Sequence, residues 1–345
     1  MSAQKPVLLI TGGAGFIGSN FLRYMHETYQ NYHLVNLDKL TYAGNTANLD
    51  LLEGAVNYTF IEGDIADEQL VQRIFAKYDI HGVIHFAAES HVDRSIQDSK
   101  QFVQTNVLGT LTLLQVAKQD WEEKGVLKER RFHQISTDEV YGSLSAEGKF
   151  SEDTPYDPRN PYSASKAGAN LLVKSFGYTY GMNIVISSSS NNYGPRQHTE
   201  KLIPTIISKA LKLEEIPIYG DGKNIRDWLY VEDHCRGLDA IFHHAPPFST
   251  YNIGGGNEVQ NLEIAKTVCS LLDEIKPELL HENSLTSFQE LITHTKDRLG
   301  HDRRYAVDDT KLRQDLGWEP QEALSTGLRK TVRWYVEQWE GVTAP

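Results

Sequence analysis

Residues 7–18 read Val-Leu-Leu-Ile-Thr-Gly-Gly-Ala-Gly-Phe-Ile-Gly, an apolar run that leads directly into a glycine-rich turn. Gly13, Gly15 and Gly18 fit the pattern G-x-G-x-x-G, while Gly12, Gly15 and Gly18 fit G-x-x-G-x-x-G. Glycines at these positions permit a tight turn and let backbone N–H groups approach a pyrophosphate at a helix N-terminus. The stretch therefore predicts a strand, a turn and a helix of the dinucleotide-binding type, with a turn that serves packing alone as the alternative.

Asp38 ends the next apolar run, 20 residues beyond Gly18. A carboxylate there can accept hydrogen bonds from the adenosine ribose hydroxyls and would repel a 2′-phosphate, so we expect NAD rather than NADP. Asp64 follows a third run and either lies beside the adenine or caps a helix. Phe86, Ala87 and Ala88 end a fourth run, where a dinucleotide could pass close to the backbone or where ordinary core could lie.

The first half of the chain alternates apolar runs with amphipathic stretches at residues 68–77, 102–119 and 164–179. This alternation predicts an α/β fold with a doubly wound, parallel Rossmann sheet. We expect residues 1–190 to form the NAD-binding domain with the catalytic residues. Residues 191–345 are expected to form a smaller, mainly substrate-binding region, with some chain returning to the core. The predicted strands are 7–11, 33–38, 58–64, 83–88, 132–137 and 184–190, and a capped helix is predicted within 309–320.

The 345-residue chain carries a formal net charge of −12, which argues against nucleic acid or an anionic membrane as the main partner. Its two cysteines, Cys235 and Cys269, and its 13 scattered histidines show no metal-ligand spacing. Such cysteine usage is typical of the reducing cytoplasm, where we expect the protein to work. No stretch approaches the roughly 20 apolar residues of a membrane-spanning helix.

Tyr162 and Lys166 are spaced i and i+4, which places a phenol and an ammonium on one face of a helix. A free phenol titrates near 10, and a neighbouring Lys⁺ and a nicotinamide cation would both favour the phenolate. Tyr162 could then take a hydroxyl proton while hydride leaves the same carbon for NAD⁺.

Thr137, Asp138 and Glu139 follow the fifth predicted strand, opposite Tyr162 and Lys166. Asp138 and Glu139 either cap a short helical turn or form an acid/base pair with separated pKa values. Their position at a strand end beside a redox site favours the second interpretation. Thr137 could hydrogen-bond a sugar hydroxyl or its developing oxyanion.

These motifs bring a family resemblance into view over essentially the whole chain. The sequence resembles the extended short-chain dehydrogenase/reductase superfamily, and most closely its dTDP-glucose 4,6-dehydratases. The glycine motif and Tyr-x-x-x-Lys belong to the whole superfamily, whereas Thr-Asp-Glu is much more specific to the dehydratases. The matching segments are 11–18, 86–95, 136–142, 162–166, 190–195, 200–204, 226–228 and 297–305.

The resemblance implies a reaction on a nucleotide-linked glucose. Tyr162 and NAD⁺ would oxidise C4, Glu139 would abstract the acidified C5 proton, and Asp138 would protonate the departing C6 hydroxyl. Return of the hydride to C6 would yield a 4-keto-6-deoxy sugar and regenerate NAD⁺. The resemblance also implies a homodimer, in which the helices at 102–119 and 164–179 pack across a two-fold axis; packing within one subunit would give the same pattern.

Carried over by position, the resemblance supplies two sets of contacts. Lys201 could equally be a solvated charge, and residues 217–219 a simple edge strand, while a guanidinium fork at Arg226 suits a diphosphate. The cofactor set is Gly12, Gly15, Phe16, Ile17, Gly18, Asp38, Lys39, Thr41, Asp64, Ile65, Phe86, Ala87, Ala88, Thr105, Tyr162, Lys166 and Asn192. The substrate set is Ser90, Thr137, Asn191, Lys201, Leu202, Pro217, Ile218, Tyr219, Arg226, Asn261, Asp297, Arg298 and His301.

The chain departs from the family pattern in two places. Leu299 stands where proline is expected, which leaves that loop less pre-organised. Ser188 and Ser189 stand in a serine run, 187–190, where Asn and Cys would be commoner. Neither change touches the proposed acid, base or hydride relay.

Other functions remain as alternatives. A nucleotide-sugar 4-epimerase or decarboxylase of the same superfamily would share Asp38, Tyr162 and Lys166. Epimerisation at C4 needs no proton taken from carbon, so it gives Asp138 and Glu139 no task. A more remote alternative is a non-catalytic NAD-binding regulator, which would have little reason to keep all five catalytic side chains in register.

Overall fold

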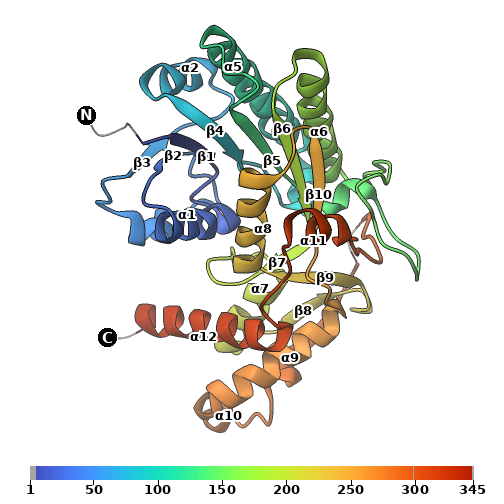
Figure 1. Ribbon diagram of the computed structural model, residues 1–345. Helices are drawn as coiled ribbons and strands as arrows, with labels where there is room; N and C mark the ends of the chain where they lie inside the picture. Colours follow the sequence, from blue (N-terminus) through green and yellow to red (C-terminus); the bar gives the residue numbers. More distant parts are fainter. Residues whose placement is uncertain (1–4, 298, 344–345) are drawn as a thin grey trace.

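Seven parallel strands form the central sheet of the computed structural model, which describes residues 5–297 and 299–343. Their spatial order is β10-β6-β5-β4-β1-β2-β3, and all neighbouring pairs run parallel (Figure 1). This arrangement confirms the expected doubly wound α/β fold. The strands are β1 (Val7–Thr11), β2 (His33–Asp38), β3 (Tyr58–Glu62), β4 (Ile80–His85), β5 (Arg131–Thr137), β6 (Ile184–Ser189) and β10 (Ser249–Ile253).

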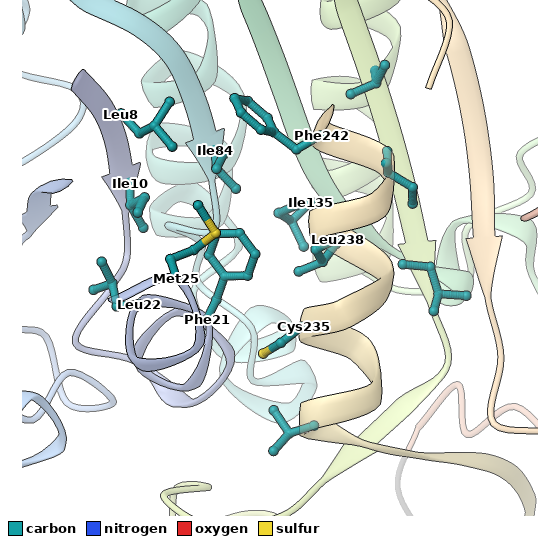
Figure 2. Packing of buried hydrophobic residues seen from close by; sticks show 14 of the residues in the cluster. Leu8, Ile10, Phe21, Leu22, Met25, Ile84, Ile135, Cys235, Leu238 and Phe242 are labelled. Atoms are coloured by element: carbon teal, nitrogen blue, oxygen red, sulfur yellow. The ribbon is translucent and has the colours of Figure 1, made fainter. Parts of the chain in front are cut away.

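Helices cover both faces of the sheet because its strands are apolar on both sides. On one face, Phe21 and Met25 of α1 (Phe16–Thr28) and Leu238 of α8 (Val231–His244) pack over Ile84 and Ile135 of the sheet (Figure 2). The other face carries α2 (Glu68–Lys77), α5 (Thr110–Glu123) and α6 (Pro161–Tyr180). Helix α8 comes from the second half of the chain, so both halves build this core.

Several boundaries differ from the sequence-based expectation, and β4 begins three residues earlier than predicted, at Ile80. Strand β3 ends at Glu62 and β4 at His85, so Asp64 and residues 86–88 lie in the loops that follow them. The single helix predicted at 102–119 consists of α4 (Ser99–Phe102), a π-helical segment η2 (Val103–Gly109) and α5. Side-chain hydrogen bonding by Asn106 inside η2 accompanies this local widening, and π-helical turns of this kind are frequent at functional sites.

Helix α6 begins where local capping chemistry directs it. Asn160 accepts a hydrogen bond from the Ser163 N–H and forms a capping box, and Pro161 occupies the first helical position. Gly181 ends the helix in the left-handed conformation, with φ 67°. Helix α11 (Thr310–Leu316) lies within the predicted 309–320 segment and ends at Gly317 as expected, but the Asp309 side chain makes no capping hydrogen bond; Asp308 Oδ1 accepts from the Thr310 N–H at 3.0 Å instead.

A smaller region packs below the carboxyl ends of the sheet (Figure 1). A third apolar cluster holds its helices against two small sheets, in the orders β11-β9-β7 and β12-β8. Its elements are β7 (Asn191–Tyr193), α7 (Leu202–Leu211), β8 (Ile216–Tyr219), β9 (Ile225–Tyr230), β11 (Glu258–Gln260), α9 (Asn261–Ile275), α10 (Pro277–Glu282), η4 (Phe288–Leu291), β12 (Ile292–Thr295) and α12 (Leu324–Thr343). Short elements complete the chain: η1 (Thr46–Leu52), α3 (Val92–Gln97) and η3 (Asp138–Tyr141).

Strand β10 pairs with β6 at the edge of the large sheet. In the chain, β10 follows β7, β8 and β9, which belong to the smaller region. The loops at the carboxyl ends of the central strands therefore face the smaller region. Among residues 5–297 and 299–343, no helix is long and apolar enough to cross a membrane.

Candidate active site

A cavity of about 310 Å³ lies at the carboxyl ends of the central strands. Cavities at this position of an open α/β sheet are the usual ligand sites. All members of the predicted cofactor set line it, together with five predicted catalytic residues and part of the predicted substrate set. The residues concerned are Gly12, Gly15, Phe16, Ile17, Gly18, Asp38, Lys39, Thr41, Asp64, Ile65, Phe86, Ala87, Ala88, Ser90, Thr105, Thr137, Asp138, Glu139, Tyr162, Lys166, Asn191, Asn192 and Lys201.

The glycine turn forms one wall of this cavity. Gly12 has φ 73°, and a Cβ atom there would lie 2.5 Å from the Ala87 nitrogen. A Cβ atom at Gly18 would lie 2.3 Å from the Gly12 carbonyl oxygen. Helix α1 follows without a side-chain cap, so its first N–H groups present the positive end of the helix dipole to the cavity. This backbone cradle fits a pyrophosphate.

Asp38 holds the glycine turn in place. Its Oδ2 accepts a hydrogen bond from the Ala14 N–H at 2.8 Å, and its Oδ1 accepts one from the Leu40 N–H at 2.8 Å. Burial raises the pKa of this carboxyl group. Each oxygen keeps a further lone pair that can accept from ribose hydroxyls, as the sequence predicts.

The structure decides differently between the alternatives for Asp64 and for residues 86–88. Asp64 lies in the cavity wall and pairs with Lys39 at 2.7 Å, while Asp67, not Asp64, caps α2. Phe86 lines the cavity and also packs against Phe21, with ring centroids 5.3 Å apart.

Tyr162 and Lys166 lie on one face of α6 and both line the cavity. Lys166 Nζ donates a hydrogen bond to the Ile135 carbonyl at 2.7 Å, and burial lowers its pKa to about 8. Burial also raises the pKa of Tyr162, and the nearby Glu139 charge raises it further. The expected depression of the Tyr162 pKa is therefore not found in the protein alone, because desolvation and the charge of Glu139 both raise this pKa.

Asp138 and Glu139 occupy different environments although they are adjacent in sequence. The Asp138 side chain is 1% exposed, and its Oδ2 has no hydrogen-bond partner among the described residues. Burial, followed by the charge of Glu139, raises its pKa well above the usual range for an aspartate. Glu139 is half-buried, and its Oε2 accepts from Asn160 Nδ2 at 3.5 Å. A buried acid with a raised pKa therefore stands beside a second, more exposed carboxyl group.

Thr137 supplies the cap that the alternative interpretation gave to the two carboxyl groups. Its Oγ1 accepts a hydrogen bond from the Glu139 N–H at 3.3 Å and donates to Asp138 Oδ1 at 3.3 Å. Because Thr137 caps η3, the carboxyl groups of Asp138 and Glu139 are not needed for capping.

A buried network joins the glycine turn to helix α6. Thr11 Oγ1 accepts from the Ala87 N–H at 3.3 Å and contacts His85 Nδ1 at 2.6 Å, while His85 Nε2 contacts Thr110 Oγ1 at 3.0 Å. Thr110 Oγ1 donates to the Asn106 carbonyl at 2.6 Å. Asn106 Nδ2 in turn donates to the Glu89 carbonyl at 3.0 Å and to Ser165 Oγ at 2.8 Å. The turn, η2 and α6 are thereby held in register.

Part of the predicted substrate set meets at the cavity. Lys201 Nζ donates to the Ser90 carbonyl at 3.2 Å and lies 4.0 Å from Glu200 Oε1, so it bridges two loops of the wall. Asn191, on β7, lines the same wall. Ser90 and Lys201, 111 residues apart in sequence, are brought together as the resemblance implies.

The remaining predicted substrate residues do not line this cavity. Arg226 is 4% exposed, donates to the Asp302 carbonyl at 2.9 Å and lies 4.4 Å above the Tyr305 ring, and its charge acts on Asp138. His301 Nδ1 and Asp297 Oδ1 lie 2.6 Å apart, beside the ring of Tyr219. Arg298 lies outside the described residues. The others are Leu202 at the start of α7, Pro217 and Ile218 on β8, paired with β12, and Asn261 at the start of α9.

Several polar residues that line the cavity were not selected from the sequence. Glu89, Ser190 and Glu200 belong to segments that carry the family resemblance, but no residue chemistry singled them out. His198 had no sequence signal, and it reaches the wall because the loop after β7 folds back. Among residues 5–297 and 299–343, no three His, Cys, Asp or Glu side chains converge as a metal site.

Known proteins of similar sequence are consistent with the geometry of this cavity. Residues 9–331 match the family model described as GDP-mannose 4,6 dehydratase. The chain is 49% identical over 336 residues to a dTDP-glucose 4,6-dehydratase of Neisseria gonorrhoeae, covering 96% of each chain. It is 48% identical over 345 residues to a dTDP-glucose 4,6-dehydratase of Salmonella typhimurium, covering 96% of this chain and 94% of the relative.

Solved structures separate what the fold shares from what the sequence distinguishes. A dTDP-glucose 4,6-dehydratase of Streptomyces venezuelae, crystallised with NAD, superposes with a TM-score of 0.86 at 41% identity, covering 98% of this chain and 99% of that one. A UDP-glucose 4-epimerase of Thermotoga maritima superposes almost as well, with a TM-score of 0.84, but at 29% identity, covering 97% and 100%. The backbone is common to both reactions, so the side chains carry the distinction.

The lowered pKa of Lys166 leads to a test of its environment. Between about pH 8 and the ordinary lysine value of 10.5, the unfolded chain binds one more proton than the folded protein. Below this window the cost of burying the ammonium is fully present, and above it the cost is absent. The free energy of unfolding of the cofactor-free protein, relative to Lys166→Met, should therefore rise by up to about 3 kcal/mol across the window.

Urea denaturation of both proteins near pH 7 and near pH 10 measures this difference. Because the variant lacks only this titrating group, the contributions of other groups cancel in the comparison. A difference in free energy that stays constant with pH would contradict the buried, pKa-shifted state of Lys166.

Proposed function

The chain belongs to the dTDP-glucose 4,6-dehydratase family of the extended short-chain dehydrogenases/reductases, and we propose that it converts dTDP-glucose to dTDP-4-keto-6-deoxyglucose and water. It is a nucleotide-sugar 4,6-dehydratase, a hydro-lyase that uses NAD. The observation that carries the proposal is the buried Asp138, whose pKa is raised, beside Glu139, in the cavity that also contains Tyr162 and Lys166. An elimination needs such an acid and base in addition to the redox pair.

NAD fits the residues present. The glycine turn and the uncapped start of α1 would hold its pyrophosphate, and Asp38 its adenosine ribose. When bound, NAD takes hydride from C4 of the glucose ring and returns it at C6, and its positively charged ring favours the phenolate of Tyr162.

Tyr162 and Lys166 handle the proton at C4. The Tyr162 oxygen accepts the proton of the C4 hydroxyl as hydride leaves C4, and the C4 oxygen remains a ketone oxygen in the product. Lys166 Nζ, fixed by the Ile135 carbonyl, supplies positive charge on the same helix face. Thr137 Oγ1, at the end of β5, would donate to the sugar oxygen as it becomes a ketone, by turning its hydroxyl hydrogen away from Asp138 Oδ1.

Asp138 and Glu139 carry out the elimination. Glu139 accepts the C5 proton, which the C4 ketone has made acidic, and Asp138 donates its proton to the departing C6 hydroxyl. When hydride is added at C6, Glu139 returns the proton to C5, so the C5–C6 double bond is reduced and the C4 ketone is kept. The raised pKa keeps Asp138 protonated for this role, as in other sites where environment separates two carboxyl groups. Asp138 is 1% exposed, whereas Glu139 is half-buried. This difference in burial supports Asp138 as the acid and Glu139 as the base.

Related reactions use the same fold but not this pair. A 4-epimerase or decarboxylase would share Tyr162, Lys166 and the glycine turn, and the epimerase backbone superposes closely. The solved epimerase is 29% identical to this chain, whereas the solved dehydratase is 41% identical. Epimerisation at C4 takes no proton from carbon, so Asp138 and Glu139 would have no task in that reaction. A non-catalytic NAD-binding protein would not need a buried protonated acid at the cavity.

We assign the parts of the chain as follows. Residues 1–190 hold the cofactor and the catalytic side chains, and residues 191–345 mainly hold the substrate while also returning α8 and β10 to the core. This is supported by the position of Asn191 and Lys201 in the cavity wall. Both cysteines are unpaired and buried, as is usual in the reducing cytoplasm, where we place the enzyme.

A homodimer is part of the proposal. Leu171 and Tyr178 of α6 are 57% and 79% exposed, and Val103 and Leu108 of the neighbouring η2 segment are 48% and 43% exposed. Four large apolar side chains on two adjoining helical segments form a surface suited to a two-fold contact between copies of this chain.

The transfer of a label tests the reaction. With dTDP-glucose carrying deuterium at C4, the product should contain the deuterium at C6 and should have lost water, as measured by mass spectrometry and NMR. Label that stays at C4 without loss of water would refute dehydration and favour epimerisation.

Two substitutions separate the base from the acid. In Glu139→Gln, we expect dehydration to fall by a factor of about 10²–10⁴ and exchange of the C5 hydrogen with D₂O to disappear. In Asp138→Asn, dehydration should fall by a similar factor while C5 exchange persists, because the base remains. Loss of C5 exchange in Asp138→Asn but not in Glu139→Gln would reverse the assigned roles.

The dimer surface can be tested with charge. Leu171→Glu combined with Tyr178→Glu should halve the molar mass measured by light scattering, because two buried carboxylates would face each other across the two-fold axis. Val56→Glu is the matched control: Val56 is 95% exposed near β3, away from α6. Equal masses for the double variant and the control would contradict the proposed interface.

A further inference from the structure

Helix α8 buries a histidine behind the cavity wall that the proposed mechanism does not use. His234 is 0% exposed, and its Nδ1 lies 2.8 Å from the side-chain oxygen of Asn192. Asn192 lies on β7 and lines the cavity. A fully buried polar side chain in contact with a cavity-lining residue can act on the site through that residue.

The orientation of the Asn192 amide follows from its other contacts. Asn192 Nδ2 donates to the Ser190 carbonyl at 3.0 Å and to Ser189 Oγ at 3.2 Å. A backbone carbonyl can only accept, so Nδ2 must face Ser190 and Oδ1 must face His234. The serine run 187–190, which departs from the family pattern, thus supplies part of the setting of Asn192.

This orientation also determines the histidine tautomer. Since Asn192 Oδ1 can only accept, His234 carries its hydrogen on Nδ1, and its Nε2 is a buried acceptor without a hydrogen-bond partner among the described residues. Burial lowers the pKa of His234 to about 3, so the ring is neutral under ordinary conditions. The hydrogen bond to Asn192 is therefore present at any pH at which the enzyme would be assayed.

The contacts of Asn192 extend to the loop that closes the cavity. The Asn192 carbonyl accepts from Gln197 Nε2 at 2.9 Å, and Ser189, Ser190 and Gln197 all line the cavity. One amide side chain and its backbone thus connect strand β6, strand β7 and the loop at Gln197. The contacts to Ser189 and Ser190 depend on an Asn192 side chain held in one rotamer, whereas the contact to Gln197 is made by the Asn192 backbone.

We propose that His234 is a positioning residue for the cofactor wall: its Nδ1–H locks the Asn192 amide, and the locked amide holds the β6–β7 turn against NAD through Ser189 and Ser190. The inference rests on the proposed function, because it assumes that this cavity holds NAD. His234 itself does not line the cavity, so it contacts neither the cofactor nor the reacting atoms.

Substitutions at His234 can keep or remove the donor. Asparagine places an amide N–H close to the position of the histidine Nδ1, whereas leucine fills similar space without a donor. His234→Leu should weaken retention of NAD by roughly tenfold, since a buried Asn192 oxygen would be left unpaired. His234→Asn should retain NAD within a few fold of wild type.

His133 offers a matched control on the neighbouring strand. It is also 0% exposed, and its Nε2 lies 2.9 Å from Ser187 Oγ, but neither residue lines the cavity. His133→Leu removes a comparable buried hydrogen bond and should destabilise the fold without weakening NAD retention. A general effect of core damage would affect both leucine variants alike.

The experiment follows NAD that stays bound to the purified holoenzyme during dialysis, with cofactor content and NAD dissociation constant as readouts. Asn192→Ala, at the partly exposed partner, is tested alone and with His234→Leu. If His234 acts through Asn192, the leucine substitution should add less than twofold in the Asn192→Ala background. If His234→Leu folds poorly, the comparison of Asn192→Ala with wild type still tests the proposal, because Asn192→Ala alone should weaken NAD retention.

Three outcomes would overturn the inference: wild-type retention of NAD by His234→Leu, retention by His234→Asn as poor as that of the leucine variant, or a full leucine effect in the Asn192→Ala background. Failure of the wild-type protein to bind NAD would instead refute the proposed function. The two failures are therefore distinguishable.

Discussion

The close approach of Gly12 to Ala87 is the contact on which the rest of the site depends. A side chain at Gly12 would collide with the backbone after β4, so β1 and β4 can end side by side only with glycine there. From this contact, hydrogen bonds run through Thr11, His85 and Thr110 to Asn106 and then to α6. The glycine turn and the catalytic helix are thus parts of one buried framework. A shift of either end would move Tyr162 relative to the cofactor cradle.

Burial acts on the catalytic groups in a consistent direction. It raises the pKa of Asp138 and Tyr162 and lowers that of Lys166, so in each case the uncharged form is favoured. Asp138 needs its proton for its proposed role, and the environment of the protein alone already supplies that state. Tyr162 must lose its proton, and for that step the protein depends on the positive charge of the bound cofactor. The site is therefore complete for proton donation before NAD binds, but not for proton removal at C4.

Much of this arrangement could be predicted from the sequence because local patterns determine it. The turn at Gly12–Gly18, the end of β2 at Asp38 and the spacing of Tyr162 and Lys166 each lie within a short segment, and all three reach the cavity. The helix predicted at 102–119 was wrong in detail, since the hydrogen bonds of Asn106 that accompany the π-helical segment reach Glu89 and Ser165, far away in sequence. The hydrogen bond between Asn192 and His234 could not be predicted from the sequence either. Periodicity describes which face of an element is apolar, but it carries no information about which polar groups meet across the core.

The expectation for Tyr162 shows a different limit. Sequence spacing predicts that a lysine is near the phenol, yet it cannot predict how much water surrounds either group. In the structure, loss of solvent and the charge of Glu139 raise the pKa of Tyr162, and Lys166 directs its ammonium to the Ile135 carbonyl.

The late return of the chain to the sheet has a consequence for synthesis on the ribosome. When residues up to Tyr230 have emerged, the glycine turn, Asp38 and all five catalytic residues are already present, but α8 and β10 are not. The face formed by Phe21, Met25, Ile84 and Ile135 is then uncovered, and the edge of β6 is unpaired (Figure 2). A nascent chain of this enzyme thus exposes an apolar surface and an open strand edge until about 20 further residues have been added, the stage at which chaperones bind such features.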